Sequence, residues 1–264
     1  MAYVLKNSWA LLLGVLLLMV GNGLQGTLLG LRGAIEGYSA STMSYVMSAY
    51  FLGFLLGSRL TPILIRRVGH VRVFAALASL ISAVFILYAA ITHPLAWMLM
   101  RLLVGLCFSG VYVVAESWLN ESSTNETRGQ ALSVYLIVQM VGIITAQGLL
   151  NLADPGGYAL FVTMSVLVSV SFAPILLAVS PAPVFETTKP MSLRQLFHVS
   201  PLGMVGALLL GGVLSALFGM APVYATEVGM SAAQTSLFIA AIYSGGMLMQ
   251  FPIGWLSDRM DRRG

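Results

Sequence analysis

Charged side chains are scarce in this sequence. Only 8% of its 264 residues are Asp, Glu, Lys or Arg, whereas 58% are hydrophobic. Soluble globular proteins carry about 25% charged residues, so this chain has too little polar surface to coat a water-facing globule. The composition therefore excludes an ordinary soluble protein and predicts a protein that is surrounded by lipid.

Cysteine, clustered histidine and catalytic motifs are also missing. Cys107 is the single cysteine, which excludes an intramolecular disulfide, and its apolar segment favours a packing role. His70, His93 and His198 fall on three different predicted loops, so we expect no metal site. The sequence has no Walker loop and no recognisable set of catalytic side chains. We therefore expect no enzyme, no ATP-driven transport and no cofactor.

Long apolar runs fill most of the chain instead. A helix needs about 20 apolar residues to cross a hydrocarbon core of about 30 Å, and these runs lack the alternation of β-barrel strands. The first run is longer than the core of a signal peptide and no A-x-A-like site follows it, so we interpret it as a retained helix. The sequence predicts an all-α, polytopic membrane helix bundle with eight spans at residues 9–31, 42–65, 73–92, 95–118, 131–152, 158–180, 201–224 and 234–256.

The basic residues gather on one side of these spans. If the N-terminus is cytoplasmic, ten of them fall on inside segments and only Arg32 on an outside loop, while Arg59 and Arg101 lie within the membrane. This asymmetry follows the positive-inside rule and predicts a multi-pass protein with a cytoplasmic N-terminus. The basic residues form no patch or tail, so we expect the lipid bilayer and not nucleic acid as a partner. The ten inside residues are Lys6, Arg66, Arg67, Arg72, Arg128, Lys189, Arg194, Arg259, Arg262 and Arg263.

The connection after the sixth span differs from the others. It begins "PAPVFETTKP", whose prolines prevent continuous helix, and continues "MSLRQLFHV", a candidate amphipathic helix at the membrane interface. It reads either as a linker between two units or as a simple cytoplasmic loop. We divide the chain into a six-helix half at 1–180, a cytoplasmic linker at 181–200, and the first two helices of a second, incomplete half at 201–264.

An internal repeat supports this division. When the chain is shifted by 192 residues, "GYSASTMSYVMSAYFLGFLLGSRLTPILIRRVGHVR" lies over "GMSAAQTSLFIAAIYSGGMLMQFPIGWLSDRMDRRG" without a gap. Each copy is one helix that ends in a basic turn, so we expect two similarly oriented helical units. The pairs include Gly37 with Gly229, Ser39 with Ser231, Gly53 with Gly245, Leu64 with Leu256, Arg67 with Arg259, and His70 with Arg262.

The basic turns carry a resemblance to a known family. The stretch "GWLSDRMDRRG" resembles the G-x-L-x-D-R-x-G-R-R signature of the major facilitator superfamily, except that Asp261 replaces a glycine. The first copy, "PILIRRVGHVR", keeps Arg67 and Gly69 but has Arg66 at the aspartate position. The residues of the second copy that fit are Gly254, Leu256, Asp258, Arg259, Arg262 and Arg263.

The fourth span adds to this resemblance. Its "RLLVGLCFSG" is similar to the family's R-x-x-x-G-x-G motif through Arg101, Gly105 and Gly110. Two features of the sequence resemble those of the bacterial YcaD-like members of the family. They are "VVAES" in the same span and Arg66 at the aspartate position. The family's antiporter motif in the fifth helix is absent, because "VGIITAQGLLN" lacks its proline. This absence argues against proton-coupled drug efflux.

The resemblance implies a fold and a function. The family has twelve helices in two halves, so we expect the chain to be truncated after its eighth helix. It implies a secondary transporter of the bacterial inner membrane that moves a small-molecule solute by alternating access, with protons as a candidate coupling ion and a monomer as the full-length state. A non-transporting membrane receptor or assembly protein is the alternative, and an integral-membrane enzyme ranks third.

Polar residues inside the spans are the candidate substrate pathway. A charge near the bilayer centre costs about 2.5 to 3.5 kcal/mol on insertion scales, so Arg101 should have a purpose there. It either lines a central cavity or is a structural arginine satisfied by carbonyls and amides of the first helix. For the other polar groups, including Gln147 and Gln250, helix–helix hydrogen bonds are the common alternative. The predicted pathway residues are Asn22, Gln25, Arg101, Gln139 and Tyr243.

A second candidate site is a charge relay that gates the transporter. In the family, loop arginines and a carboxylate of the fourth helix latch one state, which implies an ion pair from Glu116 to Arg59 or Arg67. The alternatives are a static ion pair at the helix end, a solvated carboxylate, and positive charges that only set the topology. Arg66, which stands where the family has an aspartate, weakens the latch expected in the first half. The predicted relay residues are Arg59, Arg66, Arg67, Gly69, Glu116, Gly254, Asp258, Arg259, Arg262 and Arg263.

Two pairs of glycines predict close helix contacts. Gly53 and Gly57 lie four residues apart in the second span, and Gly26 and Gly30 do so in the first. Such small-xxx-small faces let backbones approach closely and slide. Packing alone explains them equally well.

Overall fold

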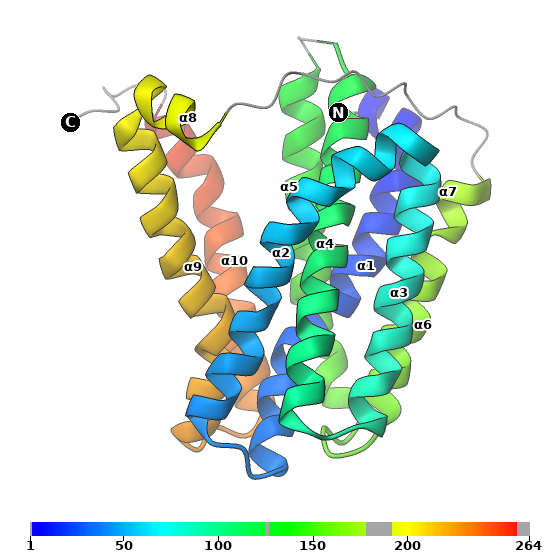
Figure 1. Cartoon of the computed structure of the whole chain (residues 1–264). Helices are drawn as coiled ribbons and strands as arrows, with labels where there is room; N and C mark the ends of the chain where they lie inside the picture. Colours follow the sequence, from blue (N-terminus) through cyan, green and yellow to red (C-terminus); the bar gives the residue numbers. More distant parts are fainter. Residues whose placement is uncertain (1, 125–126, 178–191, 258–264) are drawn as a thin grey trace.

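The computed structural model describes residues 2–124, 127–177 and 192–257, and this part of the chain is helical (Figure 1). Eight helical segments of the described chain, one of them formed by α6 and α7 together, are long and apolar enough to cross a membrane, which confirms the predicted spans. The elements are α1 (Ala2–Ile35), α2 (Ala40–Val68), α3 (His70–Ala90), α4 (Pro94–Glu121), α5 (Arg128–Leu149), the short 3-10 helix η1 (Leu150–Leu152), α6 (Ala159–Ser171), α7 (Ala173–Leu177), α8 (Leu193–Val199), α9 (Pro201–Glu227) and α10 (Ala232–Ser257).

The helices form two groups. In the first group, α1 to α7, helix α2 packs against α4, α1 against α5 and α6, and α3 against α4 and α6. The second group, α9 and α10, stands beside it, with α9 against α1 and α2 and α10 against α5. Figure 1 shows the two groups in contact at one end of the bundle and diverging toward the other.

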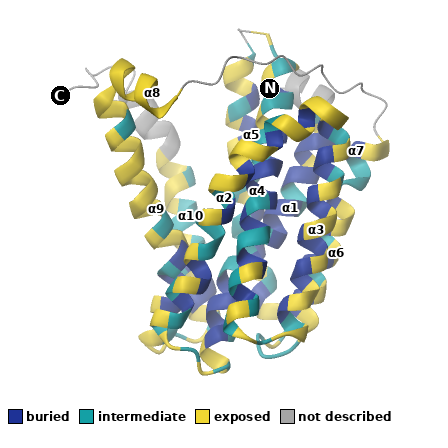
Figure 2. Ribbon diagram, in the orientation of Figure 1, coloured by how far each residue is buried: buried dark blue, intermediate teal, exposed yellow. Residues whose placement is uncertain are grey.

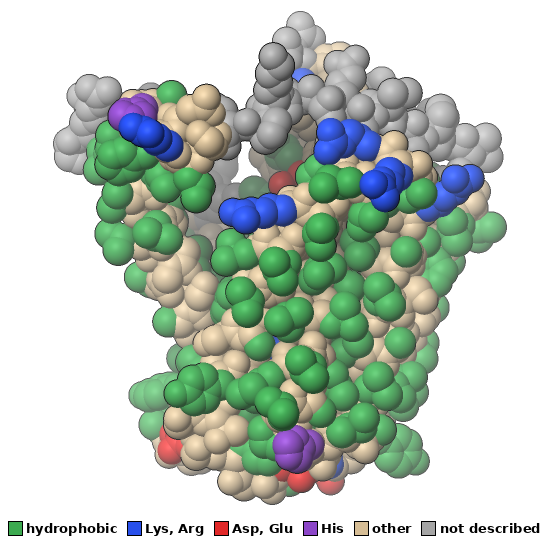
Figure 3. Space-filling model, viewed as in Figure 1, with side chains coloured by type: hydrophobic (Ala, Val, Ile, Leu, Met, Phe, Trp, Pro, Cys, Tyr) green, Lys and Arg blue, Asp and Glu red, His purple; other side chains and the backbone are tan. Residues whose placement is uncertain are grey.

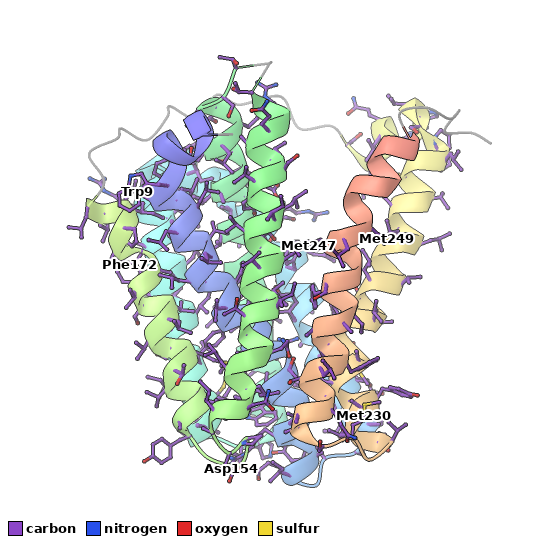
Figure 4. The ribbon with its side chains drawn as sticks, turned by 180° about the vertical axis from the view of Figure 1, so that it is seen from behind. Trp9, Asp154, Phe172, Met230, Met247 and Met249 are labelled. Carbon is purple, nitrogen blue, oxygen red and sulfur yellow. The ribbon has the colours of Figure 1, made fainter. Side chains whose placement is uncertain are left out.

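We call the diverging end the N-terminal end, because it carries the N-terminus and α8, and the other the far end (Figure 1). Most of the Lys and Arg side chains in view gather at the N-terminal end, whereas Asp and Glu side chains are seen at both ends (Figure 3). Asp154 of the α5–α6 connection and Met230 of the α9–α10 connection both lie at the far end (Figure 4). The basic residues of the described chain are therefore unevenly divided between the two ends, in the sense that the sequence predicts.

Burial follows the two groups. The interior of the first group is buried, whereas most of α9 and α10 is exposed (Figure 2). Its core includes fully buried aromatic side chains such as Phe74, Phe85 and Phe108. Many leucines are exposed on the outside, as expected of helices whose outer faces meet lipid, where apolar side chains carry no penalty.

The sixth predicted span differs from the structure in one respect. Helix α6 ends at Ser171 and α7 begins at Ala173, so Phe172 interrupts the span. Pro174 lies two residues further on, and proline has no N–H to donate and clashes with the carbonyl four residues earlier. The interruption therefore has a local cause. The predicted short helix of the linker is present as α8, whose Ser192 and Gln195 form a capping box.

Glycines bring α2 and α4 into backbone contact. A Cβ atom on Gly53 would overlap the carbonyl oxygen of Leu102, and one on Gly105 would overlap that of Tyr50. Gly57 meets Leu106 in the same way, one turn further along α2. The small-xxx-small prediction for α2 is therefore confirmed as close packing.

The predicted repeat is visible in backbone geometry. Gly37 and Gly229 have φ angles of 75° and 76°, a left-handed conformation that glycine adopts easily after a helix. Ser39 and Ser231 accept hydrogen bonds from backbone N–H groups three residues later, and each precedes the first residue of its helix. The backbone hydrogen bonds that match at the 192-residue shift, donor first, are Glu36 to Arg32 and Val228 to Tyr224, Gly37 to Ala34 and Gly229 to Thr226, Tyr38 to Gly33 and Met230 to Ala225, and Met43 to Ser39 and Thr235 to Ser231.

Candidate solute cavity and buried polar cluster

A cavity lies between the two helix groups, formed by α1 and α5 on one side and α9 and α10 on the other. It encloses about 400 Å³ of space free of protein atoms, part of it open. The cavity is lined by Asn22, Gly23, Gly26, Thr27, Ile143, Gln147, Leu217, Phe218, Ala221, Pro222, Ile239, Ile242 and Tyr243.

Contacts between the two groups close the cavity toward the far end. Asn151 Nδ2, in η1 directly after α5, donates a hydrogen bond of 2.9 Å to Ser236 Oγ of α10. Gly30 of α1 lies against Pro222 of α9, so close that an added Cβ would be 2.6 Å from the proline Cβ. Toward the N-terminal end, Figure 3 shows a hollow between the groups, with basic side chains on its α2 side.

Two of the predicted pathway residues meet in this cavity. Asn22 of α1 and Tyr243 of α10 both line it, although they are far apart in the sequence. Tyr243 stacks on Phe218 of α9, with ring centroids 4.9 Å apart and an interplanar angle of 18°. The structure therefore brings these two candidates together, one from each group.

Gln147 forms hydrogen bonds between two helices, the alternative to a solute-pathway role that the sequence analysis left open. Thr27 Oγ1 donates a hydrogen bond of 3.0 Å to Gln147 Oε1, and Gln147 Nε2 donates one of 3.3 Å to the Gly23 carbonyl. These bonds join α1 to α5 and leave Gln147 almost fully buried. Gln147 is therefore a helix–helix contact at the cavity wall.

Arg101 and Gln25 lie in a buried cluster beside the cavity and not in its lining. Arg101 is 5% exposed and its Cζ stands 4.7 Å from the ring centroid of Tyr50 on α2. Gln25 is fully buried, and its Nε2 donates a 3.1 Å hydrogen bond to the Tyr88 hydroxyl on α3. Tyr88 is also an electrostatic neighbour of Arg101, so the cluster joins α1, α2, α3 and α4.

The guanidinium of Arg101 has no counter-ion in the described part of the chain. It forms no ion pair there, and its Nε and the Oε1 of Gln25 have no hydrogen-bond partner. The alternative role for Arg101, a structural arginine bound by carbonyls and amides of the first helix, is not seen, because no hydrogen bond joins Arg101 to α1 in the described chain. Tyr50 and Tyr88, which the sequence analysis missed, are its neighbours instead. Nothing in their local sequence marks them, since contact with Arg101 depends on how the helices pack.

Gln139 lies elsewhere. It is partly exposed on α5 and is not among the residues that line the cavity. Its place in a solute pathway stays a prediction.

The predicted gating ion pair is not formed among the described residues. Glu116 and Arg59 are both exposed, and neither belongs to an ion pair among the described residues. Glu116 instead lies beside Tyr135 of α5. Arg67 is exposed as well, and Arg66 Nε donates a 3.2 Å hydrogen bond to the Pro62 carbonyl of its own helix.

His70 is not a loop residue, contrary to the sequence analysis. It is the first residue of α3, directly after Gly69, and is 1% exposed. Its Nε2 lies 3.0 Å from Ser117 Oγ and 3.9 Å from Glu121 Oε2, both on α4. Burial of a polar ring at a helix start needs partners from another helix, which hydropathy along one chain segment cannot reveal.

The second copy of the relay falls mostly outside the described residues. Asp258, Arg259, Arg262 and Arg263 follow the described part of the chain, and Gly254 lies within α10. Their gating roles stay predictions.

Sequence comparison identifies the family. Residues 11–264 match the family model of the Major Facilitator Superfamily. The uncharacterised MFS-type transporter YcaD of Escherichia fergusonii is 31% identical over 255 residues, which cover 96% of this chain and 66% of the relative. An uncharacterised MFS-type transporter of Enterobacter sp. (strain 638) is 30% identical with the same coverage. The chain thus spans just under two thirds of the length of these curated relatives.

Solved structures show the same fold. A bacterial homologue of the human lysosomal transporter Spinster, in an inward-facing and unoccupied conformation, matches with a TM-score of 0.78 and 15% identity, covering 100% of this chain and 64% of that one. A D-xylose–proton symporter matches with a TM-score of 0.65 and 15% identity, covering 96% and 68% of the two chains. With its membrane-spanning helices, its repeat and these matches, the chain belongs to the major facilitator superfamily of transporters.

Proposed function

We propose that the protein is a secondary active transporter that moves a small solute by alternating access. The observation that carries the proposal is the cavity between the two helix groups, closed by contacts at the far end. Transporters of this kind bind solute near the bilayer midplane between repeated units, and rock one unit against the other. Such a motion requires a cavity that is lined by residues of both helix groups.

Alternation would exchange one closed end for the other. The far-end contacts of Asn151 with Ser236 and of Gly30 with Pro222 must break when the cavity opens there. The exposed Arg59 and Glu116 are then available to form the predicted latch at the N-terminal end. Arg66, Arg67 and the second-copy charges would contribute to the same closure.

The pathway residues take different roles in this proposal. Asn22 and Tyr243 contact the solute, because both line the cavity. Arg101 and Gln25 act from the buried cluster beside it. Protons are the candidate coupling ion, since one charge crossing 100 mV supplies about 2.3 kcal/mol, enough for roughly fifty-fold accumulation. We place the protein in a bacterial inner membrane, with a cytoplasmic N-terminus and as a monomer.

A cross-linking experiment tests alternating access. In a Cys107→Ser background, the double variant Asn151→Cys/Ser236→Cys is reconstituted into proteoliposomes and oxidised. Flux is read by mass spectrometry of a defined mixture of small metabolites inside and outside the vesicles. We expect the double variant to lose at least tenfold in flux on oxidation and to regain it on reduction.

The matched control is Ser236→Cys alone, which should transport equally with and without oxidant. Unchanged flux in the oxidised double variant would contradict alternating access. If the protein with natural residues at these positions moves no solute at all, the receptor or assembly function gains instead.

A further inference from the structure

The free polar groups of the cavity are few and uncharged. None of the thirteen lining residues is acidic or basic. Thr27 and Gln147 satisfy one another across the wall, with an Oγ1 to Oε1 distance of 3.0 Å. Asn22 and Tyr243 form no hydrogen bond within the described chain, so one amide and one hydroxyl remain for a ligand.

The apolar walls have flat surfaces. Phe218 and Tyr243 present stacked rings, 4.9 Å apart between centroids, on the α9 and α10 wall. On the α1 wall, Gly26 leaves a notch, because no atom lies within 4 Å of the position that a Cβ would take. Rings prefer offset stacking on other rings, and a glycine notch lets a ligand approach the helix backbone.

The lining of the cavity disfavours ionised ligands. None of its residues is acidic or basic, so a cation or an anion would lose its water there without gaining a counter-ion. For an anion, the lining offers only one amide and one hydroxyl as donors, too few to replace its water.

We propose that this cavity binds an uncharged planar ring, an aromatic or heteroaromatic group stacked on Tyr243 beside the Gly26 notch and hydrogen-bonded to Asn22. The proposal rests on the proposed function only in taking the cavity as the solute site. It names the chemical class that the transporter selects.

Binding of defined probes to the purified protein in detergent tests the proposal. The uncharged planar probes are indole and coumarin, and the matched probes are indole-3-acetate as an anion, tryptamine as a cation and cyclohexanol as an uncharged ring that is not planar. Isothermal titration should show saturable binding of at least one planar uncharged probe. The matched probes should bind at least tenfold more weakly.

Two variants locate the binding. Gly26→Leu fills the notch and should weaken binding of the planar probe at least tenfold. Gly211→Leu is the matched control, because Gly211 is an exposed glycine of α9 that also has no atom within 4 Å of an added Cβ. It should bind the probe as the parent protein does. If Gly26→Leu fails to fold, as judged by thermal unfolding and gel filtration, Tyr243→Leu provides the same comparison.

Three results would overturn the proposal. They are equal binding by parent and notch-filled protein, stronger binding of the charged probes, and no saturable binding of either planar probe. Detergent binding does not depend on flux, so the two proposals fail separately. Probe binding without solute movement would contradict transport alone, whereas flux of an ionised solute that Gly26→Leu leaves intact would contradict only the ligand class.

Discussion

Gly30 of α1 and Pro222 of α9 touch each other and occupy equivalent positions of the internal repeat, 192 residues apart. Equivalent residues of two related units meet only where the axis between the units passes. The contact therefore lies at the axis that relates the two helix groups. It is on the closed side of the cavity. Because glycine has no side chain, the proline can approach the α1 backbone there.

A side chain at this contact should open the far end. Gly30→Leu places a bulky group 2.6 Å or less from Pro222, and overpacking of this kind costs about 1–3 kcal/mol. We expect the conformational equilibrium to shift toward opening of the far end, and Ser236→Cys, made in a Cys107→Ser background, to react at least threefold faster with a membrane-impermeant maleimide. Gly148→Leu on α5, where an added Cβ has no neighbour within 4 Å, should leave that rate unchanged.

The two copies of the repeat give a matched test of glycine packing. Gly53 and Gly245 occupy equivalent positions, but only Gly53 faces a backbone, that of α4, whereas nothing lies within 4 Å of a Cβ on Gly245. Gly53→Ala should lower the free energy of unfolding by about 1–3 kcal/mol through steric overlap with α4. Gly245→Ala should be neutral or slightly stabilising. Thermal unfolding in detergent distinguishes the variants, and equal effects would show that α2 and α4 can separate freely.

Replacing Arg101 should lower the flux of solute without lowering the stability of the protein. Its buried guanidinium has no counter-ion in the described chain, so removing the charge relieves a desolvation penalty. We expect Arg101→Met to unfold at the same temperature as the parent protein or higher, while flux falls at least tenfold. Arg101→Lys should keep part of the flux. A large loss of stability in Arg101→Met would instead identify a structural arginine.

The hydrogen bond between Thr27 and Gln147 should contribute modestly to stability. Buried side-chain hydrogen bonds between membrane helices average about 0.6 kcal/mol, with values up to about 1.7. A double-mutant cycle with Thr27→Val and Gln147→Leu should give a coupling energy in this range, measured by equilibrium unfolding. A coupling of zero would mean that the 3.0 Å contact contributes nothing to folding.

The spans and the repeat could be predicted from the sequence because both are local properties. A helix in lipid satisfies its own backbone hydrogen bonds, so its length and apolar composition reveal it without knowledge of its neighbours. The same holds for the glycine turns at Gly37 and Gly229, whose left-handed backbone is a property of single residues. The Gly53 and Gly57 face was also readable, since four-residue spacing places both residues on one side of a helix.

The site itself was decided by the tertiary structure. Asn22 and Tyr243 reach the cavity whereas Arg101 does not, and His70 is buried against α4 rather than exposed in a loop. No sequence pattern could separate these cases, because the spans are apolar on nearly all sides and hydropathy does not fix how each helix is rotated. Rotation depends on contacts with helices many residues away. The sequence by itself determined which segments cross the membrane, and only the packing of those segments determined which side chains meet.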